Sequence, residues 1–248
     1  MQLGEDVYLV GSGALGFDLT DPFDCHVYLI DGGDELALID AGAGLGHDAI
    51  LANIAAHGFD PGRLGAVLLT HAHADHAGGA ARFHEELGVR VAASPLAADR
   101  VRRGDEAALS LPAAREAGIY PASYRFAACP VGSEVREGDE LVVGRHRLTV
   151  LETPGHCADH LSFLMRGAGG RDILFAGDAV FHGGHILLQY IPDCSIWEYG
   201  QTVEKLARLS FDMLLPGHGA VSLGGATRHV AAARQRLAAL ALPHNLVH

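Results

Sequence analysis

The sequence predicts an α/β fold, and two observations support this. Short, continuously apolar runs typical of buried strands alternate with longer segments whose apolar residues recur at helical spacing. Several of these runs end directly in histidine or aspartate, so chemically active side chains follow strand ends. No low-complexity segment or change in composition marks a boundary, and we therefore expect a single domain over residues 1–248.

In the first half of the chain, short strands are expected to alternate with helices. The strands are expected at residues 6–10, 26–30, 35–39, 65–69 and 89–93. The helices are expected at residues 46–57 and 77–87, and Gly58 is a typical helix stop after the first of them. The strand at 35–39 ends at Asp40, and the strand at 65–69 runs into a histidine-rich loop.

Residues 95–126 interrupt this alternation. Helical pieces are expected at residues 97–103 and 105–109, and Pro112 and Pro121 break the pattern. The segment carries more apolar residues than a simple linker needs, so we interpret it as an irregular helical insert. It either covers the functional site or packs on the scaffold as a structural excursion.

The second half of the chain is expected to contain more strands. They are expected at residues 140–143, 147–152, 160–165, 172–176 and 211–215. A Ser-x-x-Glu capping box at Ser195 predicts a helix that runs to about residue 209. A last helix is expected at residues 225–242, before Pro243.

The composition restricts the class of protein and its partners. The chain has 248 residues, of which 49% are hydrophobic and 19% charged, as in soluble globular proteins. Its formal net charge of −12 disfavours nucleic acids and anionic membranes, so we expect a small-molecule substrate. We also expect a cytoplasmic protein, because the start shows no secretory signal and the cysteines form no CxxC pair. The sequence does not decide between a monomer and a homodimer.

The densest cluster of reactive residues lies at residues 70–79, which read THAHADHAGG. It contains His71, His73, Asp75 and His76, and neutral imidazoles with a carboxylate are typical ligands of zinc and similar metals. Three later strand ends carry further candidate ligands: His156, Asp178 and His218. Five imidazoles and two carboxylates exceed the needs of one four-coordinate ion, so the pattern predicts two metals that share a bridging ligand.

The ordered motifs resemble those of the metallo-β-lactamase fold superfamily, over essentially the whole length of the chain. They are LIDAG with Asp40, HAHADH at residues 71–76, TPGH with His156, AGD with Asp178 and PGHG with His218. The resemblance implies an αββα sandwich of two mixed β-sheets flanked by helices. The AGDAVF run and the HxHxDH pattern are similar to those of glyoxalase II and lactonase members.

The resemblance also implies two Zn²⁺ ions, with Fe or Mn as alternatives. One metal would be held by His71, His73 and His156, and the other by Asp75, His76 and His218. Asp178 would bridge both metals. Three residues are expected to support these ligands from behind: Asp40, Thr70 and His160. For Asp40 the alternative role is to cap the loop after its strand, and for His160 the alternative is direct ligation.

The expected activity is hydrolysis of a small ester, lactone or thioester. A hydroxide bridging the two metals would attack the carbonyl carbon, because metal coordination lowers the pKa of water to about 7. Asp75 and Asp178 are the expected catalytic residues, and Asp75 would carry a proton to the leaving group. The alternatives are a mononuclear-iron sulfur dioxygenase, β-lactam hydrolysis, a diiron redox protein and a non-catalytic binding module.

Several nearby residues have no role that the sequence can decide. Cys157 adjoins a candidate ligand and is expected to be a packed thiol. His182 and His185 are either ordinary loop residues or substrate contacts. Three tyrosines could donate a hydrogen bond to a substrate carbonyl: Tyr120, Tyr124 and Tyr190.

Overall fold

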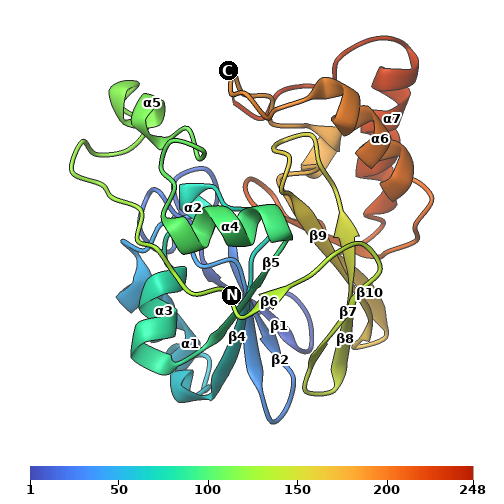
Figure 1. Cartoon of the computed structure of the whole chain (residues 1–248). Helices are drawn as coiled ribbons and strands as arrows, with labels where there is room; N and C mark the ends of the chain where they lie inside the picture. The colour runs from blue at the N-terminus through green and yellow to red at the C-terminus, as the bar shows by residue number, and fades with distance from the viewer. Residues whose placement is uncertain (248) are drawn as a thin grey trace.

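Two β-sheets pack face to face in the computed structural model, which describes residues 1–247, and helices cover their outer faces (Figure 1). The first sheet has the order β1 (Val7–Gly11), β2 (Val27–Asp31), β3 (Leu36–Ile39), β4 (Leu64–Leu68), β5 (Arg90–Ala93), β6 (Ser133–Glu134). The second sheet has the order β11 (Met213–Pro216), β10 (Arg171–Gly177), β9 (Leu161–Ala168), β8 (His146–Glu152), β7 (Glu140–Val143). Both sheets mix parallel and antiparallel pairs, so the predicted αββα sandwich is confirmed.

The helices lie in two groups. With the first sheet are α1 (His47–Ala56), α2 (Ala74–Ala77), α3 (Ala80–Leu87), α4 (Pro95–Arg103) and α5 (Leu111–Glu116). With the second sheet are α6 (Ile196–Leu206) and α7 (Thr227–Ala238). Short 3-10 turns occur at η1 (Pro61–Arg63) and η2 (His182–Gly184). Among residues 1–247, no helix has both the length and the apolar character that crossing a bilayer requires.

The core is layered, because neighbouring residues of a buried strand point to opposite faces. In β3, Leu36 and Leu38 belong to the cluster under the helices of the first sheet. Ala37 and Ile39 belong instead to the central cluster between the two sheets. A third cluster packs α6 and α7 against the outer face of the second sheet. The continuously apolar runs in the sequence therefore reflect strands that are buried on both faces.

Most of the expected elements are present, with shifts of a few residues at their ends. Residues 105–109 do not form the expected helix but a series of turns. The helix begins instead at Leu111, and Pro112 lies in its first turn, where a missing N–H costs no hydrogen bond. The expected helix at 77–87 is divided between α2 and α3, and the two-residue strand β6 had no counterpart among the predictions.

The capping box at Ser195 is only half formed. Ser195 Oγ accepts the backbone N–H of Glu198 at 3.3 Å, as expected of an N-cap. The backbone N–H of Ser195 donates to Gly155 O at 2.8 Å, so it is not left for the Glu198 side chain. The start of α6 is therefore tied to the loop that carries His156, which a local motif could not indicate.

Candidate metal centre

The candidate ligands gather where strands from both sheets end. The loop after β4 carries His71, His73, Asp75 and His76, and α2 begins inside this loop. The loops after β8, β10 and β11 carry the other candidates: His156, Asp178 and His218. Direct contacts between donor atoms link the two groups, so the structure brings all the predicted ligands together.

Asp40 holds the histidine loop from behind. Its Oδ1 accepts the backbone N–H of Thr70 at 2.7 Å, and the Thr70 hydroxyl donates to Oδ2 at 2.8 Å. His76 Nδ1 donates to the same Oδ2 at 2.8 Å, which turns His76 Nε2 towards the other ligands. Asp40 adopts a positive φ of 62°, a conformation that aspartate tolerates better than most residues.

Hydrogen bonds fix the ring orientation of two further candidate ligands. His71 Nδ1 lies 3.0 Å from Thr70 Oγ1, and His156 Nδ1 donates to Leu187 O at 3.0 Å. In both rings Nε2 is thereby left to face the centre of the cluster with a free lone pair. His156 Nε2 and His73 Nδ1 face each other at 2.9 Å.

The donor set fits metal ions on two observations. Among the candidate ligands, three buried atoms have no hydrogen-bond partner within residues 1–247: His71 Nε2, His76 Nε2 and Asp178 Oδ1. Such orphaned polar atoms are rare in folded proteins and require an explanation. Across the cluster, nitrogen-to-carboxylate distances run from 3.1 Å for His218 and Asp75 to 3.7 Å for His218 and Asp178. Donors around a tetrahedral ion with bonds of ~2.1 Å stand roughly 3.4 Å apart.

Asp178 is placed to contact both halves of the cluster. Its Oδ2 lies 3.4 Å from His156 Nε2 and 3.7 Å from His218 Nε2, and its Oδ1 lies 3.6 Å from His76 Nε2. His76 and His218 also approach Asp75 Oδ2, at 3.6 and 3.1 Å. Asp178 therefore contacts candidate ligands of both expected groups, and the division of the ligands between two metals stays a prediction.

The electrostatics favour a neutral imidazole at His71 and His73 and a protonated one at His76. Burial, reinforced by neighbouring histidines, lowers the pKa of His71 well below its usual value and that of His73 to about 4. Burial opposes charge on His76 as well, but nearby carboxylates raise the pKa of His76 above its usual value. Burial would raise the pKa of Asp178, yet the histidines around it hold this pKa well below its usual range. His71, His73 and the Asp178 carboxylate thus have the protonation states that a metal needs, whereas His76 would release a proton when a metal binds.

His160 supports the site and is not free to ligate. Its Nε2 accepts the backbone N–H of Asp178 at 2.9 Å, so its proton lies on Nδ1, which donates to Thr153 Oγ1 at 2.8 Å. Both ring nitrogens are therefore used. Burial lowers the pKa of His160 well below its usual value, consistent with this neutral form.

Two supporting residues could not be identified from the sequence. The hydroxyl of Tyr199, in α6, lies 3.0 Å from Asp178 O and 3.1 Å from Leu187 O, the carbonyl that also accepts His156 Nδ1. In α4, Arg100 Nη1 lies 2.9 Å from carboxylate oxygens of both Asp159 and Asp193. Neither residue belongs to a motif that indicates a metal site, and only the tertiary fold brings them to the ligand loops.

Cys157 lies beside the centre, whereas the two loop histidines contact histidines outside the ligand set. Cys157 is fully buried, and its sulfur lies within 4.8 Å of donor atoms of His71 and His73. Burial raises the pKa of the Cys157 thiol well above its usual value, which keeps it protonated. The rings of His182 and His229 are tilted by 43° with centroids 4.2 Å apart, and the ring centroids of His185 and His244 lie 5.6 Å apart.

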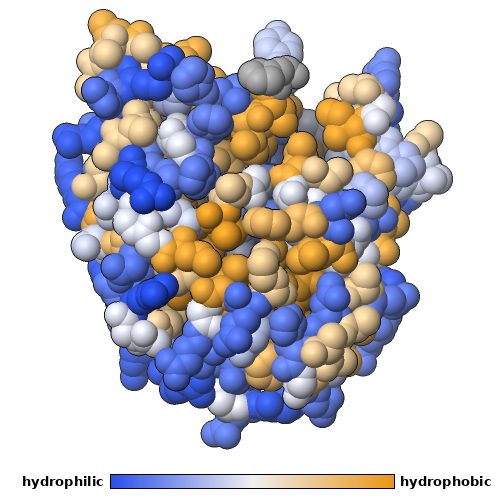
Figure 2. All heavy atoms as spheres, turned by 180° about the vertical axis from the view of Figure 1, so that it is seen from behind, coloured by the Kyte–Doolittle hydropathy of each residue, from blue (hydrophilic) through white to orange (hydrophobic). Residues whose placement is uncertain are grey.

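A cavity of about 580 Å³ opens beside the ligands. One wall comes from residues 109–120, the opposite wall from residues 187–191 with Val247, and Leu15 lies at the edge. Seen from behind, the molecule has two raised parts with hydrophobic residues between and below them (Figure 2). Residues 95–126 therefore do more than pack on the scaffold, because the part from Leu109 to Tyr120 lines this cavity.

The three candidate tyrosines lie in different surroundings. Tyr120 and Tyr190 line the cavity, and Tyr190 is fully exposed. Tyr120 packs against Tyr124 with ring centroids 5.0 Å apart, and burial together with the nearby Asp75 carboxylate raises the pKa of Tyr120 well above its usual value. The Tyr124 hydroxyl points away and donates to Ala43 O at 2.8 Å.

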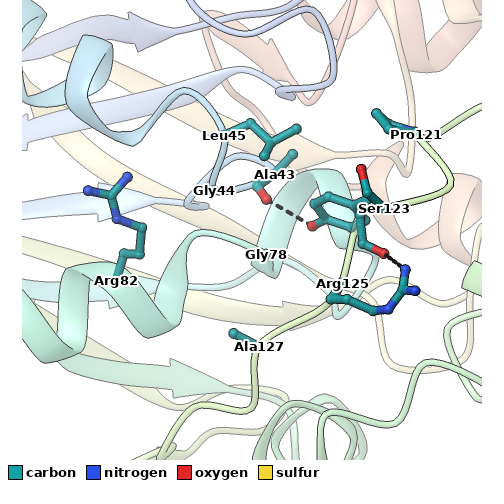
Figure 3. Close-up of a pocket in the computed structure, with 10 residues that line it drawn as sticks. Ala43, Gly44, Leu45, Gly78, Arg82, Pro121, Ser123, Arg125 and Ala127 are labelled. Atoms are coloured by element: carbon teal, nitrogen blue, oxygen red, sulfur yellow. Dashed lines mark hydrogen bonds between the residues drawn. The ribbon is translucent and has the colours of Figure 1, made fainter.

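A second pocket, of about 250 Å³, is lined by residues that include Leu45, Arg82 and Arg125 (Figure 3). Its two arginines are already engaged. Arg125 donates to the backbone oxygens of Ala122 and Tyr124, and Arg82 pairs with Asp48 and Glu86. None of the candidate metal ligands lines this pocket.

Comparison with known proteins decides the family. The sequence pattern of the Metallo-beta-lactamase superfamily matches residues 20–218. The chain belongs to this superfamily. The predicted resemblance is therefore confirmed.

Several relatives are similar in sequence. The bovine acyl-coenzyme A thioesterase MBLAC2 is 28% identical over 211 residues, which cover 78% of this chain and 72% of the relative. The atrochrysone carboxyl ACP thioesterase of Aspergillus fumigatus is 29% identical, over 79% of this chain and 51% of the relative. A hydroxyacylglutathione hydrolase of Cereibacter sphaeroides is 32% identical, over 63% of this chain and 49% of the relative. The chain thus spans about half the length of the last two relatives.

Solved structures show the fold. BJP-1, a subclass B3 metallo-beta-lactamase of Bradyrhizobium japonicum, aligns with a TM-score of 0.73 at 24% identity, over 97% of this chain and 91% of that one. FEZ-1 from Legionella gormanii aligns with a TM-score of 0.68 at 21% identity, over 88% and 78% of the two chains. At this level of identity the likeness concerns the fold alone.

Proposed function

We propose that the protein is a metal-dependent hydrolase that cleaves a small thioester, or a related ester or lactone. The observation that carries the proposal is the convergence of the superfamily ligands on one end of an apolar cavity. Relatives named as thioesterases and as a hydroxyacylglutathione hydrolase support the thioester as the first choice of bond. The formal net charge of −12 supports a small molecule as the substrate, with neither nucleic acid nor membrane as a partner.

Two divalent ions of the zinc type fit the donor set, and iron or manganese suit the same nitrogen and oxygen donors. One ion would be held by His71, His73 and His156 and the other by Asp75, His76 and His218, with Asp178 within reach of both groups. When bound, such ions polarise a carbonyl oxygen and lower the pKa of water to about 7.

Asp75 is the residue best placed to orient the nucleophile. Its carboxylate lies on the cavity surface, and Oδ2 is 3.1 Å from His218 Nε2. Burial would raise the pKa of Asp75, but His76 and His218 hold it well below its usual range, so the group is an ionised carboxylate that can orient the nucleophile by accepting a hydrogen bond from it. Asp178, buried and fixed at its backbone by His160, keeps the two ligand groups in register.

Tyr120 orients this reaction from the cavity side. Its ring is held between Tyr124, at 5.0 Å, and Phe23, at 5.6 Å, and both it and Asp75 line the cavity. With a pKa well above its usual value, Tyr120 keeps its proton and can donate a hydrogen bond to Asp75 or to a substrate carbonyl.

Metal analysis and a substrate screen on one preparation test the proposal. We expect thioester hydrolysis that stops on chelation and returns on addition of zinc, with lower activity on lactones and β-lactams. One iron per chain with consumption of oxygen would instead establish the sulfur dioxygenase alternative. Hydrolysis confined to β-lactams would overturn the thioester assignment and keep the metal centre.

A further inference from the structure

We infer that the cavity binds the apolar acyl chain of the substrate and that the wall formed by residues 109–120 limits the length of this chain. The inference rests on the proposed function, which it deepens by naming the substrate class: acyl esters or thioesters whose acyl chain is uncharged and of medium length. The volume of about 580 Å³ lies within the ~300–1,000 Å³ that is usual for small-molecule sites.

The lining shows which chemistry the cavity accepts. Apart from the candidate metal ligands at one end, the walls carry no charged side chain among the residues that the structure describes. Both carboxylates on the surface, Asp75 and Asp178, belong to those ligands, and no lysine or arginine lines the cavity. An anionic group would therefore find no counter-charge on the walls, whereas a hydrocarbon chain would lose water from its whole length.

The wall formed by residues 109–120 leaves space in the cavity for an acyl chain. Leu109 and Leu111 are buried and anchor it to the core cluster of the first sheet. Between these anchors and Ile119, the side chains on the cavity are small: Ala113, Ala114 and Ala117. Larger apolar residues come from the facing wall: Leu187 and Ile191. A chain lying between the walls would contact methyl groups on one side and branched side chains on the other.

Polar contacts fix this wall independently of the metal ligands. Arg115, in α5, pairs with Glu106 at 2.7 Å and donates to Tyr124 O at 2.8 Å. Glu106 also accepts the backbone N–H of Phe126 at 3.0 Å. The wall is thus a preformed surface, and a side chain added to it would change the space for the acyl chain without touching the hydrogen bonds that hold the ligands.

The rim of the cavity is also apolar. Ile119 is 58% exposed and Leu15 is 50% exposed, although both are large hydrophobic residues. The fully exposed Tyr190 belongs to the same rim. Isolated exposed apolar residues are common on protein surfaces. A group of them around an apolar opening is typical of a site for an apolar ligand.

Chain-length dependence tests the inference. The substrates are the acetyl, butanoyl, hexanoyl and octanoyl thioesters of N-acetylcysteamine, an uncharged leaving group. We expect kcat/KM of the native protein to rise by about fourfold per methylene, the factor that corresponds to ~0.8 kcal/mol for each buried CH₂.

Ala114→Phe fills the cavity and is expected to lower the ratio of octanoyl to acetyl kcat/KM by about tenfold or more. The matched control is Ala107→Phe, because Ala107 is exposed and outside the cavity; its ratio should equal that of the native protein.

A binding measurement separates this inference from the proposed function. Calorimetry with the uncharged ketone 2-decanone should show binding to the native protein and to Ala107→Phe, and binding about tenfold weaker to Ala114→Phe. Such binding in a protein that hydrolyses no thioester would overturn the proposed function and uphold the acyl cavity. Hydrolysis with a flat chain-length profile and no binding of 2-decanone would overturn the acyl cavity and uphold the hydrolase.

Discussion

The metal ligands and the cavity walls lie side by side but are held by different means. Hydrogen bonds from buried neighbours orient the ligands, as Asp40 does for His76 and His160 does for Asp178. The wall of residues 109–120 is held by apolar packing of Leu111 and by the ion pair of Arg115. The difference suggests that the two regions can change separately: loss of a hydrogen bond should affect metal binding, and a change in side-chain volume should affect the choice of substrate.

Removal of a ligand should have the largest effect. For His71→Ala and Asp178→Ala we expect metal content and thioester hydrolysis to fall together, because each leaves a partly filled coordination sphere. The loss of activity should exceed the ~10–100-fold that loss of a residue behind a ligand produces. Metal stoichiometry and kcat/KM measured on the same samples check this. Retained turnover with unchanged metal content would show that the ligand assignment is wrong.

Replacement of a residue behind a ligand should have an intermediate effect. Asp40→Asn removes the negative charge that accepts His76 Nδ1 and Thr70, and we expect metal affinity to fall ~10–100-fold. Competition with a chelator measures the affinity. Asp48→Asn is the matched control, since Asp48 is exposed and pairs only with the half-exposed Arg82. Equal affinities for the two variants would mean that Asp40 only caps its loop.

A smaller effect is expected for Tyr120→Phe, which deletes one hydroxyl from the cavity surface. We expect kcat to fall by roughly tenfold with little change in KM, because the hydrogen bond to Asp75 or to the carbonyl would strengthen in the transition state. The pH profile of kcat should shift with it, since Asp75 loses a neighbouring donor. Tyr190→Phe serves as control, because Tyr190 lines the same cavity with its side chain fully exposed. An equal loss in both variants would remove the special role of Tyr120.

The smallest expected effect concerns the pH dependence of stability and comes from His229. His229 Nδ1 accepts the N–H of Gly183 at 2.9 Å, and burial, followed by His182 and Arg228, lowers the pKa of His229 to about 4. Between pH ~6.5 and about 4 the unfolded chain therefore holds a proton there that the folded chain does not, so the stability falls as the pH falls through this window.

His229→Gln isolates this contribution. The slope of unfolding free energy against pH should decrease by up to ~1.4 kcal/mol per pH unit, the value for one proton, in urea unfolding below pH 6.5. Parallel stability curves for the variant and the native protein would show that His229 does not titrate with folding. Neither cavity binding of 2-decanone nor metal content should change, because His229 lies outside both sites.

The parts of the site that consist of neighbouring residues in the chain could be predicted from the sequence. The parts that depend on contacts between distant residues could not. The candidate ligands lie in loops that begin at the ends of apolar runs, so motif and strand end could be recognised together, as for His156 and His218. Tyr199 and Arg100 act through contacts with residues distant in the chain, Asp178 and Asp159, which no local pattern encodes. Pro112 misled the prediction because proline both ends helices and begins them, and only the neighbouring turns decide between the two.

The central claim is that two metal ions and an apolar cavity together make a thioester hydrolase, and a metal titration tests it most directly. Zinc is added in steps to the metal-free protein, and bound zinc and octanoyl thioester hydrolysis are followed in the same samples. We expect activity to grow until two zinc ions are bound per chain, with no activity in Asp178→Ala at any zinc level. Full activity at one bound ion, or two bound ions with no thioester hydrolysis, would contradict the claim.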